Sequence, residues 1–288
     1  EGDLKIAIES GQVAGAALDV FEEEPAKTNA LFGMPQVVCT PHLGASTTEA
    51  QENVAVQVAE QMADYLTSGA VTNALNIPSM SAEDAAKLKP YLTLADQLGG
   101  FAGQLTEHGL KQVTIEYEGH AGKLNTKPLT AVALKGLLSP LIDNVNMVNA
   151  PLVAKERNIE VSSISHGRPT TYQTLIRITV VTEKRTRTVA GTLFGEEPRI
   201  VEVSGIKLEA DLGKRMLYVN NDDKPGFIGA LGTLLGKHKI NIANFHLGRN
   251  KEHDEAIALV EVDQPISQDV LAEIAAIAGV RQVKALQF

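Results

Sequence analysis

The sequence predicts a multidomain chain that combines α/β and α+β folds. Three observations predict this class. Two short runs rich in Val, Ala and Leu, residues 14–20 and 37–40, are too short for helices and are typical of buried parallel strands. Runs with alternating polar residues, such as LIRITVV and RTRTVAG, indicate strands with one solvated face in the middle of the chain. Residues 214–288 follow a β-α-β-β-α-β order, the ferredoxin-like split motif.

Length and composition limit the function classes. The 288 residues, 44% hydrophobic and 21% charged, are enough for about two domains of ordinary size. A formal charge of −9 argues against broad binding to nucleic acid or to a membrane surface. The one cysteine, Cys39, lies in an apolar run, so we expect a buried structural thiol, no intrachain disulfide and a cytoplasmic protein. No apolar run reaches the roughly 20 residues that span a bilayer.

The first domain is expected over residues 1–78. A short helix over residues 3–10 ends at Gly11 and leads into the first strand. After the second strand, Ser46 and Glu49 have the spacing of a capping box for a long amphipathic helix that ends at Gly69. Its apolar positions are Ala50, Val54, Val58, Met62 and Leu66. Residues 71–77 are predicted to form a short strand.

A second domain is expected over residues 79–212 and a third over residues 213–288. In the second, a helix over residues 82–106 is predicted to be kinked or broken by Pro90 and by the pair Gly99 and Gly100. The pattern then predicts a strand at 112–117, a helix at 128–138, a loop at 149–151 and strands at 160–164, 172–182, 186–193 and 200–203. In the third it predicts strands at 216–220, 240–247, 256–262 and 283–287 and helices at 227–238 and 268–278.

The chemistry of the first domain centres on Asp19, Glu24 and His42. The two apolar runs deliver these side chains to the carboxyl ends of neighbouring strands, where open α/β sheets place their active sites. A carboxylate beside an imidazole holds the ring in one tautomer and raises its pKa, which suits proton transfer coupled to hydride movement. We interpret Glu24 and His42 as an acid/base pair. The alternative is an N-capping histidine next to a surface acidic run.

The residues GAALDVFEEEP and VVCTPHLGA, between Gly15 and Ala45, resemble the D-2-hydroxyacid dehydrogenases, whose signature pairs D-V-F/Y-x-x-E-P with T-P-H-x-G/A. The resemblance implies the C-terminal part of a Rossmann-type nucleotide domain that binds NAD. It assigns catalysis to His42 and Glu24. It also implies that Asp19, His42 and the run Leu43, Gly44 and Ala45 lie at the cofactor.

Later segments resemble the long, three-domain phosphoglycerate dehydrogenases within that family. VNAPLVAKERNIEV resembles their intervening, allosteric substrate-binding domain, and D-K-P-G with I-N-I-A resembles the ACT module. The resemblance implies NAD-dependent oxidation of 3-phosphoglycerate to 3-phosphohydroxypyruvate, the first step of L-serine biosynthesis. It also implies a homo-oligomer, dimeric or tetrameric, and an L-serine effector site between paired ACT domains at Asn221, Asp223 and Asn241.

The ACT segment has a physical basis for binding an amino acid. Pro225 fixes the turn and Gly226 lets backbone approach a ligand at a helix N-terminus, where free N–H groups favour a carboxylate. A purely structural turn and cap is the alternative. In the middle domain, the basic residues form either a second anion site or, as we favour, solvated strand faces; they are His166, Arg168, Lys184, Arg185 and Arg187. Seven scattered histidines predict no metal site.

Two expected features of a complete dehydrogenase are missing from the sequence. It contains no G-x-G-x-x-G fingerprint, and its first arginine is Arg157, so the resemblance leaves His42 without the arginine that binds the substrate carboxylate. We therefore expect the C-terminal portion of a longer protein that is inactive alone. Two alternatives stay open: a regulatory module that binds L-serine without catalysis, and another hydroxyacid dehydrogenase with the same tail.

Overall fold

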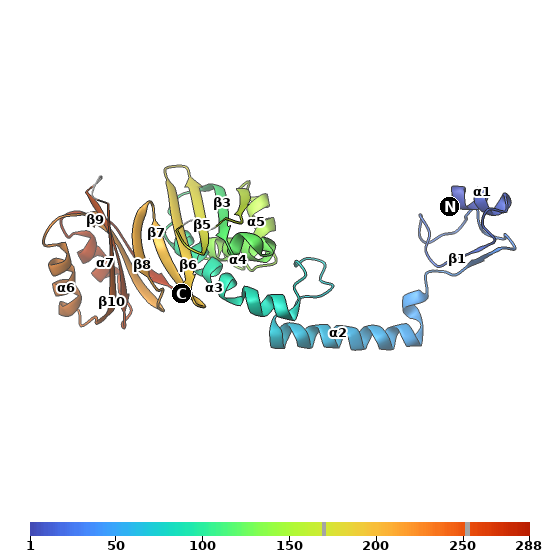
Figure 1. Cartoon of the computed structure of the whole chain (residues 1–288), viewed down its shortest axis with the longest axis horizontal. Helices are drawn as coiled ribbons and strands as arrows, with labels where there is room; N and C mark the ends of the chain where they lie inside the picture. Colours follow the sequence, from blue (N-terminus) through green and yellow to red (C-terminus); the bar gives the residue numbers. More distant parts are fainter. Residues whose placement is uncertain (169–170, 251–253) are drawn as a thin grey trace. The chain divides into compact units, whose positions relative to one another are not determined.

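The computed structural model describes residues 1–168, 171–250 and 254–288 and divides into two compact units, residues 1–70 and 71–288 (Figure 1). The first unit contains α1 (Gly2–Glu9), β1 (Ala16–Leu18), β2 (Val37–Cys39), a 3₁₀ turn (Gly44–Ser46) and α2 (Thr48–Ser68). β1 and β2 pair in parallel, with Ala16 opposite Val37. This confirms the two parallel strands expected from the apolar runs.

The predicted capping box of α2 was wrong by one residue. Ser46 ends the 3₁₀ turn, where its N–H donates to the carbonyl of Leu43, and α2 begins two residues later. Thr47 caps the helix instead, accepting a hydrogen bond from the N–H of Ala50 at 3.1 Å. The helix ends as predicted at Gly69, which has φ 74°, a left-handed conformation that favours glycine. Within its unit, α2 buries none of its residues.

The second unit contains two sheets and their helices. The first sheet and its helices comprise α3 (Ala82–Gln104), β3 (Leu110–Gly119), α4 (Thr126–Leu138), α5 (Ala150–Glu156), β4 (Glu160–His166), β5 (Thr174–Thr182), β6 (Thr186–Phe194), β7 (Glu197–Val203) and β8 (Ile206–Ala210). The second comprises β9 (Arg215–Asp222), α6 (Phe227–Lys237), β10 (Ile242–Asn250), β11 (Glu255–Val262), α7 (Gln268–Ala275) and β12 (Val280–Gln287).

Two predictions for the second unit were wrong. The strand expected over residues 71–77 is only an isolated antiparallel bridge between Val71 and Met80, within one short loop of the chain. The loop expected at 149–151 begins helix α5, with Pro151 in its first turn. Proline is tolerated there because the first N–H groups of a helix have no partner within it.

Helix α3 is one continuous element, which corrects the predicted break. Ser81 caps it by accepting from the N–H of Asp84 at 3.0 Å, and Pro90 lies inside it. Its glycines are sites of close packing against α4. A Cβ added to Gly99 would lie 2.2 Å from the carbonyl oxygen of Ala133, and one added to Gly103 would lie 2.3 Å from that of Leu137. The glycines thus let the two helix backbones touch.

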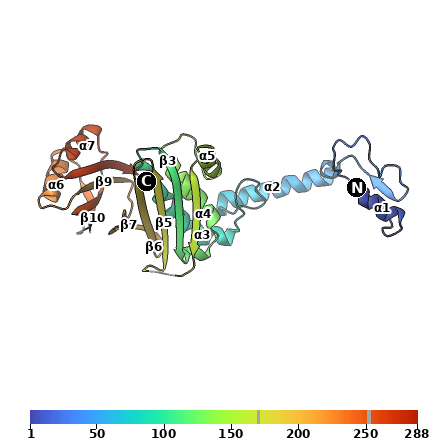
Figure 2. The same cartoon turned by 90° about the horizontal axis from the view of Figure 1, so that it is seen from above.

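The first sheet has the strand order β4-β3-β5-β6-β7-β8, and only the β3–β4 pair is parallel. Figure 2 shows α3 and α4 beside one face of this sheet. The second sheet has the order β10-β11-β9-β12 and carries α6 and α7, which confirms the ferredoxin-like split motif. One continuous core joins the two sheets, and Phe101 of α3 meets Tyr218 of β9 edge to face, with ring centroids 5.9 Å apart.

Candidate functional site

Glu24 and His42, the pair expected from the sequence, contact each other in the first unit. His42 follows β2, Glu24 lies in the loop after β1, and Nδ1 of His42 lies 2.5 Å from Oε2 of Glu24. The other carboxylate oxygen of Glu24 accepts the N–H of Phe21 at 3.0 Å. Nε2 of the ring has no partner among the described residues, so it faces solvent as a free proton acceptor or donor. The ring is bound to a carboxylate and does not cap the following turn.

Asp19 organises the loop that carries His42. Its carboxylate accepts three hydrogen bonds, from Thr40 Oγ1 at 2.6 Å, from the N–H of Leu43 at 2.8 Å and from the N–H of Gly44 at 2.7 Å. These bonds hold His42 at φ 56°, a backbone conformation that residues with a side chain rarely adopt. A Cβ at position 44 would lie 2.9 Å from Oδ2 of Asp19, so glycine is needed for this approach.

Hydrogen bonding sets the charge states of these three groups. The bond from Glu24 raises the pKa of His42, and the bond to His42 lowers the pKa of Glu24. The Thr40 hydroxyl, followed by the two backbone N–H groups, lowers the pKa of Asp19. The stabilisation from His42 is present below its unfolded pKa and is lost as pH rises through its higher folded pKa. That from Glu24 is present above its unfolded pKa and is lost as pH falls through its lower folded pKa.

A cavity of about 530 Å³ opens beside the pair. Its walls are Phe21, Phe32, Pro25, Ala26, Cys39, Thr40 and Pro41 together with Glu24 and His42. Phe21 and Phe32 meet edge to face at 5.4 Å between centroids and form its apolar side. Cys39 is half-buried, so the expectation of a buried thiol was wrong, because β2 pairs only with β1 in a two-stranded sheet and keeps one side open to this cavity.

The residues expected at the cofactor fit part of a dinucleotide. A carboxylate can accept about four hydrogen bonds. Asp19 accepts three, so one position remains for an amide N–H such as that of a nicotinamide carboxamide. The N–H groups of Leu43 and Gly44 are taken by Asp19, and Ala45 lies in the following 3₁₀ turn. The sequence interpretation missed Thr40, although the T-P-H segment contains it.

The structure brings two of the three expected effector residues together. Asn221 is the residue before the last of β9 and is buried, 2% exposed, and its Oδ1 has no hydrogen-bond partner among the described residues. Asp223 directly follows β9 and pairs with Arg249 of β10 through Nε at 2.8 Å and Nη2 at 2.7 Å. The sequence interpretation missed Arg249, because no local pattern links it to a residue so far away in the chain. Gly226, at φ 97°, begins α6 without a side-chain cap.

Asn241 lies at the opposite end of the same sheet. It precedes Ile242, which pairs with Val262 of β11, whereas Asn221 pairs with Ala256 of that strand. At the rise of an extended strand, the two ends of β11 are about 20 Å apart. Asn241 bonds locally, from Nδ2 to Asp263 Oδ2 at 2.7 Å. One copy of the chain therefore does not assemble the three residues around one ligand.

The basic residues of the middle domain do not form solvated strand faces throughout, as we had favoured. Arg187 is buried, and it donates to the carbonyl of Leu105 at 2.5 Å and to Oε1 of Gln282 at 2.8 Å. Arg185 pairs with Glu107 at 2.9 Å. Arg187 is thus held between the end of α3 and Gln282 of β12, and Arg185 is held by an acidic side chain. His166 and Arg168 are exposed.

Comparisons with known proteins match three separate segments of the chain. Residues 1–44 match the NAD binding domain of D-isomer specific 2-hydroxyacid dehydrogenases. Residues 87–204 match the D-3-phosphoglycerate dehydrogenase intervening domain, and residues 215–279 match the ACT domain. The matches thus define the class of the chain: part of a 2-hydroxyacid dehydrogenase NAD binding domain, followed by an intervening domain and an ACT domain.

Curated proteins that are similar to the chain over nearly its whole length are D-3-phosphoglycerate dehydrogenases. The chain is 39% identical to a D-3-phosphoglycerate dehydrogenase of Bacillus subtilis over 99% of its own length and 54% of that protein. It is 37% identical to the D-3-phosphoglycerate dehydrogenase of Methanocaldococcus jannaschii, over 98% of the chain and 54% of that protein. It is 38% identical to the D-3-phosphoglycerate dehydrogenase of Synechocystis, over 98% of the chain and 51% of that protein. The chain is thus similar to D-3-phosphoglycerate dehydrogenases over nearly its whole length, and the three family models match its segments in order along the chain. It spans about half the length of the curated relatives it matches.

Within residues 1–168, 171–250 and 254–288, no helix is long and apolar enough to cross a membrane. Within the same ranges, no three His, Cys, Asp or Glu side chains lie together as a set that would hold a metal ion.

Proposed function

We propose that this chain is the part of an NAD-dependent 3-phosphoglycerate dehydrogenase that supplies the acid/base pair and the regulatory module. The observation that carries the proposal is the 2.5 Å contact between Glu24 and His42 at the mouth of a cavity in a segment that matches an NAD binding domain. The product would be 3-phosphohydroxypyruvate, the precursor of L-serine.

The chain's own residues would move and hold the proton. Nε2 of His42 takes the proton from the substrate hydroxyl, while Glu24 holds the opposite ring nitrogen and stabilises the imidazolium that forms. Asp19 fixes the loop so that the ring keeps its direction. Phe21 and Phe32 give the cavity an apolar side that reduces access of water. Asp19 and the loop from Leu43 to Ala45 would hold NAD, which would supply the hydride acceptor for the carbinol carbon.

The test is the reduction of NAD by 3-phosphoglycerate. We expect turnover from a polypeptide of the relatives' length that contains these residues and none from the 288-residue chain alone. The reason is that the sequence has neither the G-x-G-x-x-G fingerprint nor an arginine before Arg157. Turnover by the purified 288-residue chain would contradict the prediction that this chain is inactive alone. Absence of turnover in the longer polypeptide would overturn the proposed activity.

We also propose that the ACT module binds L-serine between two copies of the chain. The buried, unpaired Oδ1 of Asn221 suits the ammonium group, and the uncapped start of α6 at Gly226 suits the carboxylate. Asn241 lies at the opposite end of its own sheet, so it would reach this ligand only from a second copy. This separation supports a homo-oligomer, because the site needs residues from both copies.

Calorimetry with L-serine tests the effector site. We expect Asn241→Ala to weaken binding about tenfold, the effect of losing one hydrogen bond to a charged group. Asn244→Ala is the matched control, because Asn244 lies three residues after Asn241, in β10, and its side chain likewise donates to a carboxylate, that of Glu261, at 2.7 Å. Equal heats from Asn241→Ala and the unchanged chain would count against the site.

A further inference from the structure

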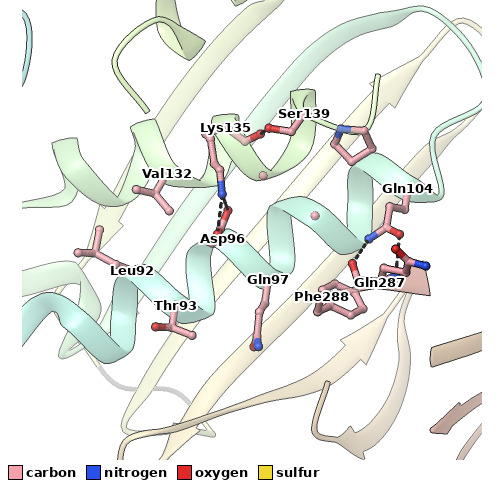
Figure 3. Close-up of a pocket in the computed structure, with 13 residues that line it drawn as sticks. Leu92, Thr93, Asp96, Gln97, Gln104, Val132, Lys135, Ser139, Gln287 and Phe288 are labelled. Atoms are coloured by element: carbon pink, nitrogen blue, oxygen red, sulfur yellow. Dashed lines mark hydrogen bonds and ion pairs between the residues drawn. The ribbon is translucent and has the colours of Figure 1, made fainter. Parts of the chain in front are cut away.

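A groove of about 720 Å³ follows the seam between α3 and α4 and ends at the last residues of β12 (Figure 3). Its volume lies within the usual range of pockets that bind small molecules. Leu92 and Val132 line one end, and Phe288 lines the other. The dehydrogenase proposal and the L-serine proposal use none of these residues.

Glycine makes this groove hollow. Gly100 of α3 and Gly136 of α4 face each other where the helices cross, so backbone forms the floor. A Cβ at Gly136 would lie 2.4 Å from the carbonyl oxygen of Asp96 and therefore cannot be added. A Cβ at Gly100 would meet only the ring of Phe288, at 3.8 Å, which is an ordinary contact. The space above Gly100 is thus open and bounded by an aromatic ring.

An ion pair lies in the middle of the groove (Figure 3). Nζ of Lys135 lies 3.0 Å and 2.9 Å from the two carboxylate oxygens of Asp96, and both side chains are a little over a third exposed. An ammonium group has three donors and a carboxylate accepts about four hydrogen bonds. Each partner therefore keeps unused capacity, a donor on Lys135 and acceptor positions on Asp96. The groove therefore exposes a positive ammonium group and a negative carboxylate next to each other.

We propose that this groove binds a free amino acid with an apolar side chain. The ligand's ammonium group bonds to Asp96 and its carboxylate to Lys135, which completes a ring of four alternating charges without breaking the existing pair. Asp96 and Gly100 are one helical turn apart, about 6 Å. A side chain the size of leucine spans that distance and covers the floor at Gly100 against the Phe288 ring.

Such a ligand would contact the intervening helices and the ACT strand together. The end of β12 is already fixed to α3 by two bonds between Gln104 and Gln287, each 2.9 Å long. β12 pairs with β9, where Asn221 lies. An occupied groove would therefore strengthen the attachment of the strand next to the proposed effector residues.

Titration of the full 288-residue chain with L-leucine, followed by calorimetry and by backbone NMR, tests the proposal. We expect saturable binding with shifts at Gly100 and Lys135. Two analogues should each bind at least about tenfold more weakly, since each lacks one charged contact: isopentylamine, without the carboxylate, and 4-methylpentanoate, without the ammonium group. L-Serine added beforehand should not displace L-leucine or reduce the number of L-leucine sites, because the two ligands use different residues.

Two variants locate the binding. Gly100→Leu fills the groove and should abolish binding, and Asp96→Asn should weaken it at least about tenfold by removing one charge. Glu83→Gln is the matched control, because Glu83 forms a comparable pair with Lys87 on the same helix outside the groove, at 2.6 Å. Circular dichroism checks that Gly100→Leu is folded. If it is not folded, the affinity of Asp96→Asn for L-leucine alone tests the binding site. The proposal is overturned if L-leucine does not saturate the chain, if L-serine displaces it, or if Asp96→Asn binds as tightly as Glu83→Gln.

Discussion

Gly99→Ala is expected to destabilise the second unit by about 3 kcal/mol, the upper part of the range for overpacking a core. In an ordinary helix the same change stabilises by up to about 1 kcal/mol, because alanine has the higher helix propensity. The sign reverses here because the added methyl would lie 2.2 Å from the carbonyl oxygen of Ala133 and 3.0 Å from the N–H of Leu137. Both are backbone atoms, so relief requires α3 and α4 to move apart along their whole contact.

Gly100→Ala is the matched control, since it changes the adjacent residue of the same helix. Its methyl meets only the Phe288 ring at 3.8 Å, so we expect unchanged or slightly higher stability. Urea unfolding followed by helical circular dichroism measures both variants, because the chain has no tryptophan for fluorescence. Similar midpoints for Gly99→Ala and Gly100→Ala would show that the helix contact is softer than the structure indicates.

These glycines also show where sequence reasoning about the fold reached its limit. Propensity predicted a kink or a break at Pro90 or at Gly99 and Gly100, because it describes each residue by itself and not against a neighbouring helix. The loss of helix propensity is outweighed by backbone contact with α4, which the local pattern does not contain. The β-α-β-β-α-β order was predictable, since alternation and turn residues are local signals. Helix α5 was missed because Pro151 was taken as a loop marker, although it is also a helix-start residue.

The candidate sites, like the fold, were predictable from the sequence only in part. Glu24 and His42 were predictable as a pair because parallel strands end at one edge of a sheet, so residues 18 positions apart meet. The partners of Asp19 were not predicted, because they depend on how the loop after β2 turns back. Asn221 and Asn241 were grouped by resemblance alone. Sheet register separates them, and register is set by pairing across β11, which composition does not reveal.

His42→Gln is expected to lower kcat for 3-phosphoglycerate oxidation by about 10² to 10⁴-fold in a polypeptide of the relatives' length, the range that general base catalysis contributes. Glutamine retains a polar side chain of similar reach but cannot accept and release a proton at neutral pH. Binding of NAD, followed by its fluorescence change, should be little altered, because Asp19 holds the loop through backbone N–H groups. Loss of NAD binding in proportion to activity would instead assign His42 a structural role.

Glu24→Gln tests the pairing itself through the pH dependence of kcat/KM. The carboxylate raises the pKa of His42, so oxidation, which needs the neutral ring, should increase as pH rises through that pKa. With glutamine the pKa falls towards the ordinary value of about 6.5, and the acidic limb of the profile should move to lower pH while the maximum rate decreases. Glu23→Gln, one residue earlier in the same acidic run, removes the same charge without touching the ring and should leave the limb in place. If the acidic limb of the kcat/KM profile shifts equally in Glu23→Gln and Glu24→Gln, then net charge, and not the 2.5 Å contact, sets the pKa of His42.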